Sequence, residues 1–118
     1  MTTPAVMGVD SSTQSCKVEI RDLTSGNILG SGAAPHPPAF PPCSEQHPRD
    51  WVAALVVAAG QAMAACAERP DIRAISVAAQ CHGLVLLDEH GEVLRAAKLW
   101  NDTTGAPNLA RLVERILH

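Results

Sequence analysis

Three short polar segments of this sequence carry residue types that can bind metal ions, phosphates or sugars. Residues 10–17 read DSSTQSCK, residues 80–83 read QCHG, and residues 100–104 read WNDTT. None of the three is decisive by itself, but their order along the chain is more specific than any one of them. The elements that must position them follow from the periodicity of the surrounding sequence.

The first segment combines a carboxylate, hydroxyl groups and an ammonium group, in Asp10, Ser11, Ser12, Thr13 and Lys17. An acid at the end of a strand, followed by a hydroxyl-rich turn, can hold a hydrated divalent cation and donate hydrogen bonds to phosphate. The segment is not a P-loop, because the pattern GxxxxGK[ST] is absent. An ordinary Asx turn is the alternative interpretation.

The second segment, Gln80-Cys81-His82-Gly83, follows an apolar run that is predicted to be a strand. Ligands of sheets with crossover connections often bind beyond the carboxyl ends of strands. Gln80 and His82 offer both donors and acceptors, as recognition of a polyol requires. The alternative is a turn in which His82 has only a local structural role.

The third segment places Trp100 before Asn101 and Asp102. An aromatic face beside an amide and a carboxylate suits a sugar with several hydroxyls. Trp100 could equally belong to the core, and either Asp102 or Thr103 could be the N-cap of a following helix.

Length and composition limit the classes of protein. With 118 residues, 47% of them hydrophobic and 18% charged, the chain resembles one globular domain or part of one. A net charge of −3 argues against nucleic-acid binding, which depends on clustered basic residues. No apolar run approaches the roughly 18 residues of a membrane span, and the first residues lack the features of a secretory signal. We therefore expect a cytoplasmic protein that binds neither nucleic acid nor membrane.

The spacing of the cysteines also favours a cytoplasmic location. The four cysteines, Cys16, Cys43, Cys66 and Cys81, form no CxxC pair and show no regular spacing. This favours reduced thiols over a disulfide framework. A zinc site built from Cys43, Cys81 and nearby histidines is a minor alternative.

Periodicity predicts strands at residues 5–9, 16–21, 28–33 and 72–79, a hairpin of residues 84–87 and 93–97, and helices from Pro48 and near Pro107. Six prolines between residues 35 and 48 exclude helix and central strand there, so we expect an extended connection. The predicted apolar positions of the helices are Trp51, Leu55, Val56, Ala59, Met63 and Cys66 in the first, and Leu109, Leu112, Val113, Ile116 and Leu117 in the second.

The order of these elements predicts an α/β fold. The third strand, the first helix and the strand at residues 72–79 imply a crossover on a mixed sheet. The continuous small and apolar character of residues 72–79 predicts that this strand is buried on both faces.

The segments GVDSSTQSCKV, SEQHPRDW and ISVAAQCHGLVLLDEHGEVLRAAKLWND together resemble the amino-terminal part of the FGGY carbohydrate kinases, and within that family most closely the xylulokinases. The resemblance extends over residues 6–112, with the motifs in the family order. Ser44-Glu45-Gln46 and the pair QxHG and WND are the features most typical of xylulokinases.

The resemblance implies a ribonuclease H-like (actin-like ATPase) mixed sheet with crossover helices, in an incomplete first domain. Residues 1–118 would be the amino-terminal portion of the sugar-binding domain, without the second domain that holds the nucleotide. The implied activity is ATP-dependent phosphorylation of D-xylulose to D-xylulose 5-phosphate, with ATP and Mg²⁺ as cofactors. The catalytic base would lie beyond residue 118, so we expect no turnover by this chain alone. An exposed apolar edge and face would favour a homodimer.

The resemblance also implies roles for single residues. Asp10 would lie near Mg²⁺, through water, and near the phosphates. Ser12, Thr13 and Lys17 would belong to the phosphate-facing hairpin. The sugar-binding residues would be Gln80, Cys81, His82, Trp100, Asn101 and Asp102, with Asp102 hydrogen-bonded to sugar hydroxyls.

Three residues depart from the family pattern. Cys81 stands where the family usually has Met, Ser12 where it commonly has Gly, and Thr104 where it often has Arg. The last change puts in doubt any ion pair that the family makes there. The alternative functions are another FGGY kinase acting on a different sugar or polyol, a non-catalytic sugar-binding module, and a structural remnant that binds nothing.

Overall fold

The computed structural model describes residues 1–117, which form two compact units. The first unit comprises Met1–Pro37 with Arg49–Gln80, and the second comprises Pro38–Pro48 with Cys81–His118. Each unit is built from two separate segments of the chain. Most of the proline-rich connection therefore lies in the same unit as the segment after Gln80. The elements of the first unit are β1 (Thr3–Ser11), β2 (Ser15–Asp22), β3 (Ile28–Pro35), α1 (Pro48–Ala65) and β5 (Pro70–Ala79).

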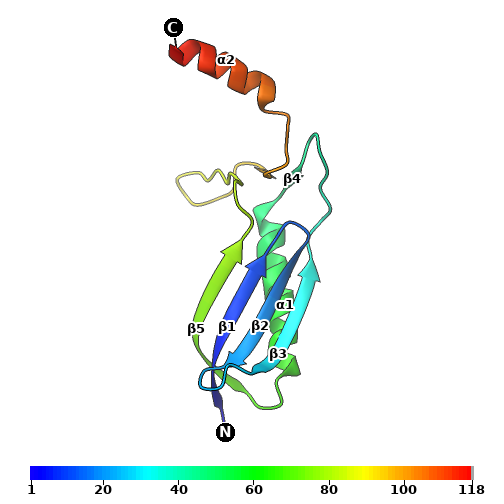
Figure 1. The fold of residues 1–118 in the computed structure, drawn as a ribbon, viewed down its shortest axis with the longest axis vertical. Helices are drawn as coiled ribbons and strands as arrows, with labels where there is room; N and C mark the ends of the chain where they lie inside the picture. The colour runs from blue at the N-terminus through cyan, green and yellow to red at the C-terminus, as the bar shows by residue number, and fades with distance from the viewer. Residues whose placement is uncertain (118) are drawn as a thin grey trace. The chain divides into compact units, whose positions relative to one another are not determined.

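The sheet of the first unit has the strand order β3-β2-β1-β5. Strands β1, β2 and β3 form an antiparallel meander, whereas β5 pairs with β1 in parallel. Helix α1 connects β3 to β5 across one face of the sheet (Figure 1). The predicted mixed sheet with a crossover helix is therefore confirmed.

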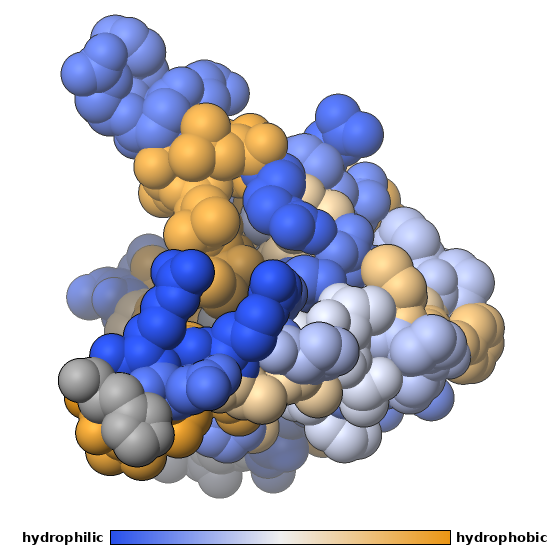
Figure 2. Space-filling view, turned by 90° about the horizontal axis from the view of Figure 1, so that it is seen from above, coloured by the Kyte–Doolittle hydropathy of each residue, from blue (hydrophilic) through white to orange (hydrophobic). Residues whose placement is uncertain are grey.

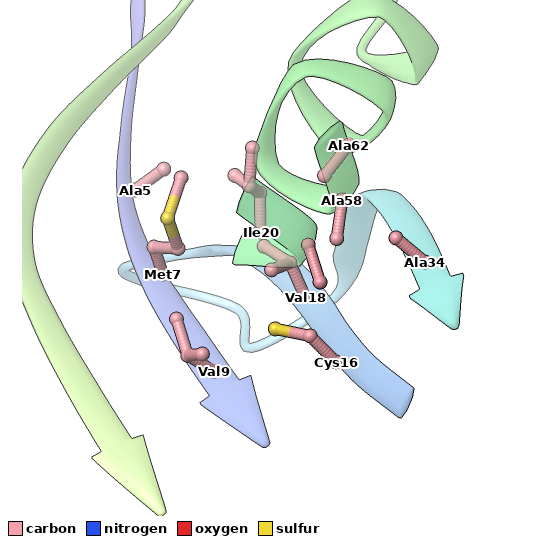
Figure 3. Close-up of a cluster of buried hydrophobic side chains, with 10 residues drawn as sticks. Ala5, Met7, Val9, Cys16, Val18, Ile20, Ala34, Ala58 and Ala62 are labelled. Atoms are coloured by element: carbon pink, nitrogen blue, oxygen red, sulfur yellow. The ribbon is translucent and has the colours of Figure 1, made fainter. Parts of the chain in front are cut away.

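The core of the first unit lies between the sheet and α1. Alternate residues of β1 and β2 face the helix, among them Met7, Val9, Val18 and Ile20 (Figure 3). Their neighbours along the strands face the opposite side, because successive side chains of a strand alternate between faces. The helix contributes a row of buried alanines spaced four residues apart: Ala54, Ala58 and Ala62.

Two glycines of β3 allow α1 to approach the sheet closely. A Cβ atom on Gly30 would lie 2.2 Å from the carbonyl oxygen of Ala62, and one on Gly32 would lie 2.1 Å from that of Ala58. Only small helix residues fit at such a separation. The predicted apolar face of the helix was therefore partly wrong, since Val56 is 66% exposed while the alanine row is buried.

Strand β5 differs from its prediction. Ile75 and Val77 are 61% and 60% exposed, so the strand is not buried on both faces. Helix α1 packs on β1, β2 and β3, and β5 is the last strand of the sheet among the described residues. In this chain the apolar residues of β5 therefore form an edge strand. Figure 2, which views the molecule from above, shows that apolar side chains reach that surface as well.

The second unit contains two short strands and a helix. Strand β4 (Glu45–Gln46) pairs with β6 (Ala97–Lys98), and α2 (Ala106–Leu117) follows. The predicted hairpin forms two isolated antiparallel bridges, Leu84 with Lys98 and Leu87 with Val93, rather than two continuous strands. Lys98 belongs to β6, which also pairs with β4. No residue of α2 is buried, and no helix of the described residues is long and apolar enough to cross a membrane.

Candidate functional site

Asp10 and Gln80 lie at the same edge of the sheet. Asp10 is near the carboxyl end of β1, and Gln80 directly follows β5. The two strands are parallel neighbours in which Asp10 is level with Ala78 and Ser11 with Ala79. Within the first unit, the first predicted polar segment therefore meets Gln80, the first residue of the second segment, at the carboxyl ends of two parallel strands. The rest of the second segment belongs to the second unit.

The turn between β1 and β2 leaves the Asp10 carboxylate exposed. The Ser12 amide donates to the carbonyl of Ser15 at 3.0 Å, and the Ser12 hydroxyl donates to Asp10 at 3.4 Å. Lys17 is the cross-strand neighbour of Asp10. On the sheet face opposite α1, a shallow hollow is lined by Gly8, Val9, Asp10, Lys17, Glu19, Ser76 and Ala78.

This arrangement fits a hydrated divalent cation beside a phosphate. The described residues form no ion pair with Asp10, so its oxygens can accept hydrogen bonds from the water ligands of Mg²⁺. Lys17 presents a cation on the same face, as phosphate oxygens require. The donor set is therefore compatible with Mg²⁺ and a phosphate chain.

Two hydrogen bonds join the β1–β2 turn to the end of β5. The Gln80 amide N–H donates to the Ser11 carbonyl at 3.0 Å. The Thr13 hydroxyl donates to Gln80 Oε1 at 3.1 Å. Because its carbonyl oxygen already accepts the bond from Thr13, the Gln80 side chain presents its NH₂ group as the hydrogen-bond donor to a ligand.

His36 is a further residue of this edge that the sequence analysis missed. Its side chain is buried, and its backbone N–H donates to the Gln14 carbonyl at 2.8 Å. Its Nε2 atom lies 3.4 Å from the Ser11 hydroxyl. Burial lowers the pKa of His36, while the charge of Asp50 acts in the opposite direction. Proline-rich sequence has no period from which this burial could be inferred.

In the second unit, Asp102 is the centre of a hydrogen-bond network. Its side chain is only 3% exposed. It accepts hydrogen bonds from the Ser44 and Thr104 amides, each at 2.9 Å, and from the Thr104 hydroxyl. These bonds hold its pKa below the ordinary value, with the Thr104 hydroxyl contributing most. The N-cap alternative was wrong, because the Gly105 carbonyl accepts the first bond of α2, from Leu109.

Lys98 links Asp102 to Glu45. Its ammonium group donates to Glu45 at 3.1 Å, to the Thr104 hydroxyl at 2.7 Å and to Asp102 at 3.4 Å. Arg95 also pairs with Glu45. The hydrogen bond with Glu45 is the main cause that raises the pKa of Lys98. An ion pair of Asp102 thus exists in this chain, with Lys98, although Thr104 replaces the arginine of the family pattern.

The other predicted sugar-binding residues are at or near the surface of the second unit. Trp100 is 58% exposed, so the core alternative was wrong. Cys81 and His82 are exposed, and His82 has a φ of 57°, in the left-handed region that non-glycine residues rarely adopt. Asn101 Oδ1 is buried and has no hydrogen-bond partner among the described residues. An exposed indole ring and an unused amide oxygen are both suited to a polyol.

One group of three possible metal ligands occurs in residues 1–117. Cys43, Glu45 and Asp102 place ligand atoms within 4.8 Å of one another. The Lys98 ammonium already lies between the two carboxylates and supplies the positive charge that a metal would bring. The zinc site predicted as an alternative from Cys43 and Cys81 with histidines does not form among the described residues.

Comparison with known proteins identifies the family. Residues 5–117 match the N-terminal domain of the FGGY family of carbohydrate kinases. The chain is 43% identical over 114 residues to a xylulose kinase of Streptomyces coelicolor, an alignment that covers 96% of this chain and 23% of that protein. It is 46% identical over 101 residues to a xylulose kinase sequence of Arthrobacter sp., covering 86% of this chain and 97% of that sequence.

The fold matches as well. The crystal structure of a xylulose kinase from Bifidobacterium adolescentis superposes with a TM-score of 0.79 at 40% identity, covering 96% of this chain and 21% of that one. The chain thus has the actin-like, ribonuclease H-like fold of these kinases over the part that it spans. That part is about a quarter of the length of the Streptomyces relative.

Proposed function

We propose, from the premise that this chain belongs to the FGGY family of carbohydrate kinases, that it is the amino-terminal portion of a xylulokinase sugar-binding domain. The complete enzyme would transfer the γ-phosphoryl group of ATP to D-xylulose. The observation that carries the proposal is the meeting of Asp10 and Gln80 at one sheet edge, in a chain more than 40% identical to two xylulose kinases.

In the proposed reaction, the terminal hydroxyl oxygen of D-xylulose attacks the γ-phosphorus of ATP. The bond from that phosphorus to the bridging oxygen breaks, ADP leaves, and the hydroxyl proton passes to a catalytic base, an ionised carboxylate outside residues 1–118. Little covalent chemistry is left to the protein, so catalysis depends on positioning and on electrostatic stabilisation. The residues of this chain would supply part of both.

The phosphate side of the site is assigned to the β1–β2 turn. Asp10 would hold Mg²⁺ through water, and the bound ion would neutralise charge on the phosphate oxygens. Lys17 would pair with a phosphate oxygen, and the hydroxyls of Ser12 and Thr13 would donate hydrogen bonds. The exposure of Asp10 and its place opposite Lys17 support this assignment.

The sugar side is assigned to the segment after β5 and to the WND segment. The Gln80 NH₂ group would donate to a sugar oxygen, and the exposed His82 and Cys81 would line the pocket. Trp100 would offer its ring, and the unused Asn101 oxygen would accept from a hydroxyl. Asp102 would share its oxygens between the sugar and the network that holds it in place.

The nucleotide domain and the catalytic base are proposed to lie outside residues 1–118, so the chain alone would bind sugar without turning it over. Titration calorimetry with D-xylulose, D-ribulose and glycerol, together with an assay of ATP hydrolysis, tests this. Strongest binding of D-xylulose without hydrolysis supports the proposal. Preference for another compound would favour a different FGGY kinase, and the absence of any binding would contradict the assignment.

The same proposal includes a cytoplasmic location, where ATP is available as the phosphate donor. A homodimer is a further part of it. The exposed Ile75 and Val77 on the edge strand β5 support self-association, because long apolar edges readily pair with other chains. Sedimentation at several concentrations measures it directly.

A further inference from the structure

We propose that His36 is a positioning residue of the site, acting through Ser11 on the sheet edge where Asp10 and Gln80 meet. The effect of His36 on sugar binding rests on the proposed function, whereas its contact with Ser11 does not depend on that function. His36 lies in the first unit, directly after β3, and is 5% exposed. No chemical step of the proposed reaction uses it.

His36 contacts both ends of the β1–β2 turn. Its backbone N–H donates to the Gln14 carbonyl at 2.8 Å, on the β2 side of the turn. Its imidazole Nε2 lies 3.4 Å from the hydroxyl of Ser11, the last residue of β1. His36 therefore fixes the distance between Ser11 and Gln14, the two residues that flank Ser12 and Thr13 in the turn.

The surroundings of the imidazole select one tautomer. Nδ1 is buried and has no hydrogen-bond partner among the described residues. A buried ring nitrogen without a partner is tolerated more readily as an acceptor than as an N–H donor. The proton is therefore assigned to Nε2, which donates it to the Ser11 hydroxyl.

Ser11 transmits this contact to the two functional residues. It directly follows Asp10, and its carbonyl accepts the hydrogen bond from the Gln80 amide at 3.0 Å. If Ser11 loses its side-chain anchor, the end of β1 gains freedom and the bond to Gln80 opens more often. His36 thus supports the residues assigned to metal and to sugar at once.

Amide hydrogen exchange of the whole chain tests the contact without any ligand. We expect the Gln80 amide to exchange about fivefold faster in His36→Ala, since one hydrogen bond contributes about 1 kcal/mol. The matched control is the Leu23 amide, which bonds to the Pro4 carbonyl at the far end of β1. It should keep its rate.

His36→Gln separates positioning from general packing, because the Gln amide can donate from near the place of Nε2. We expect it to restore the slow exchange of Gln80 to within about twofold, and Ser11→Ala to reproduce the His36→Ala result. Equal acceleration of Leu23 and Gln80, or an unchanged Gln80 rate in both His36→Ala and Ser11→Ala, would overturn the proposal. Where His36→Ala does not fold, Ser11→Ala and His36→Gln give the same comparison.

Sugar affinity then connects the contact to function. His36→Ala should weaken D-xylulose binding severalfold, and His36→Gln should recover it. If the parent chain binds no sugar while the exchange result holds, the proposed function fails and the positioning role stands. If the parent binds and His36→Ala binds equally well, the positioning role in the site is refuted.

Discussion

The hydroxyl of Thr13 donates a hydrogen bond of 3.1 Å to the side-chain carbonyl of Gln80, 67 residues further along the chain. The bond joins the turn assigned to phosphate with the residue assigned to sugar. It also decides which end of the Gln80 amide is presented to a ligand, because among residues 1–117 the oxygen accepts the Thr13 hydrogen bond and no partner is recorded for the NH₂ group.

Removing this hydroxyl should weaken sugar binding. Thr13→Val keeps the shape of the side chain but frees Gln80 to rotate, so we expect about a fivefold higher dissociation constant for D-xylulose, measured by titration calorimetry. Thr24→Val, at an exposed residue of the β2–β3 turn, is the matched control and should leave binding unchanged. Equal affinities of the two variants would argue against an orienting role for Thr13.

The close approach of α1 to β3 predicts a large difference between two Gly-to-Ala substitutions. Gly32→Ala should destabilise the first unit by about 1–3 kcal/mol or more, because the added methyl group meets the backbone of α1. Gly8→Ala is the control, since a Cβ atom there meets nothing within 4 Å. Urea denaturation followed by circular dichroism measures both, and similar midpoints would refute the packing described here.

The Lys98 network predicts a loss of stability in the second unit. Lys98→Met leaves the carboxylates of Glu45 and Asp102 close together without their shared cation, so we expect a lower thermal midpoint. Added salt should reduce the difference from the parent chain, because screening weakens the interactions of partly exposed charges. Lys98→Arg keeps the positive charge, so its thermal midpoint should fall less. A thermal midpoint of Lys98→Met equal to that of the parent would exclude a stabilising role for the Lys98 network.

His36 predicts a pH dependence of folding. Burial lowers its pKa in the folded chain, so below about pH 6.5 the unfolded chain binds the proton more readily. The free energy of unfolding should therefore decrease as the pH falls below about 6.5, until the folded imidazole is protonated as well. His36→Gln should lack this component, whereas His90→Gln, at an exposed histidine, should retain it. Parallel stability curves for His36→Gln and the parent would contradict the prediction.

The sequence was sufficient for the parts of the fold that depend on local patterns. Alternation in residues 16–21 marked β2, and the apolar runs before Asp10 and Gln80 marked two strands whose carboxyl ends meet. What local patterns could not supply were distances between segments. The buried alanine row of α1 depends on Gly30 and Gly32 of another strand, and no helical period contains that information.

The candidate site likewise combines residues that local patterns identified with contacts that they could not predict. Asp10, Thr13 and Gln80 carried recognisable chemistry, and the structure brings them together. Within the second unit, Lys98 and Glu45 were missed as a network because their pairing depends on the short strands β4 and β6. The exposed β5 was predicted as buried because its composition is that of an internal strand, although α1 leaves Ile75 and Val77 uncovered.

The most direct measurement of the central claim is the titration of D-xylulose into the parent chain, His82→Ala and His90→Ala. Both histidines are exposed residues of the second unit, but only His82 belongs to the proposed sugar site. The account predicts saturable binding to the parent and to His90→Ala, and at least a tenfold loss in His82→Ala, about 1.4 kcal/mol. Equal binding by all three chains, or no binding by the parent, would contradict it.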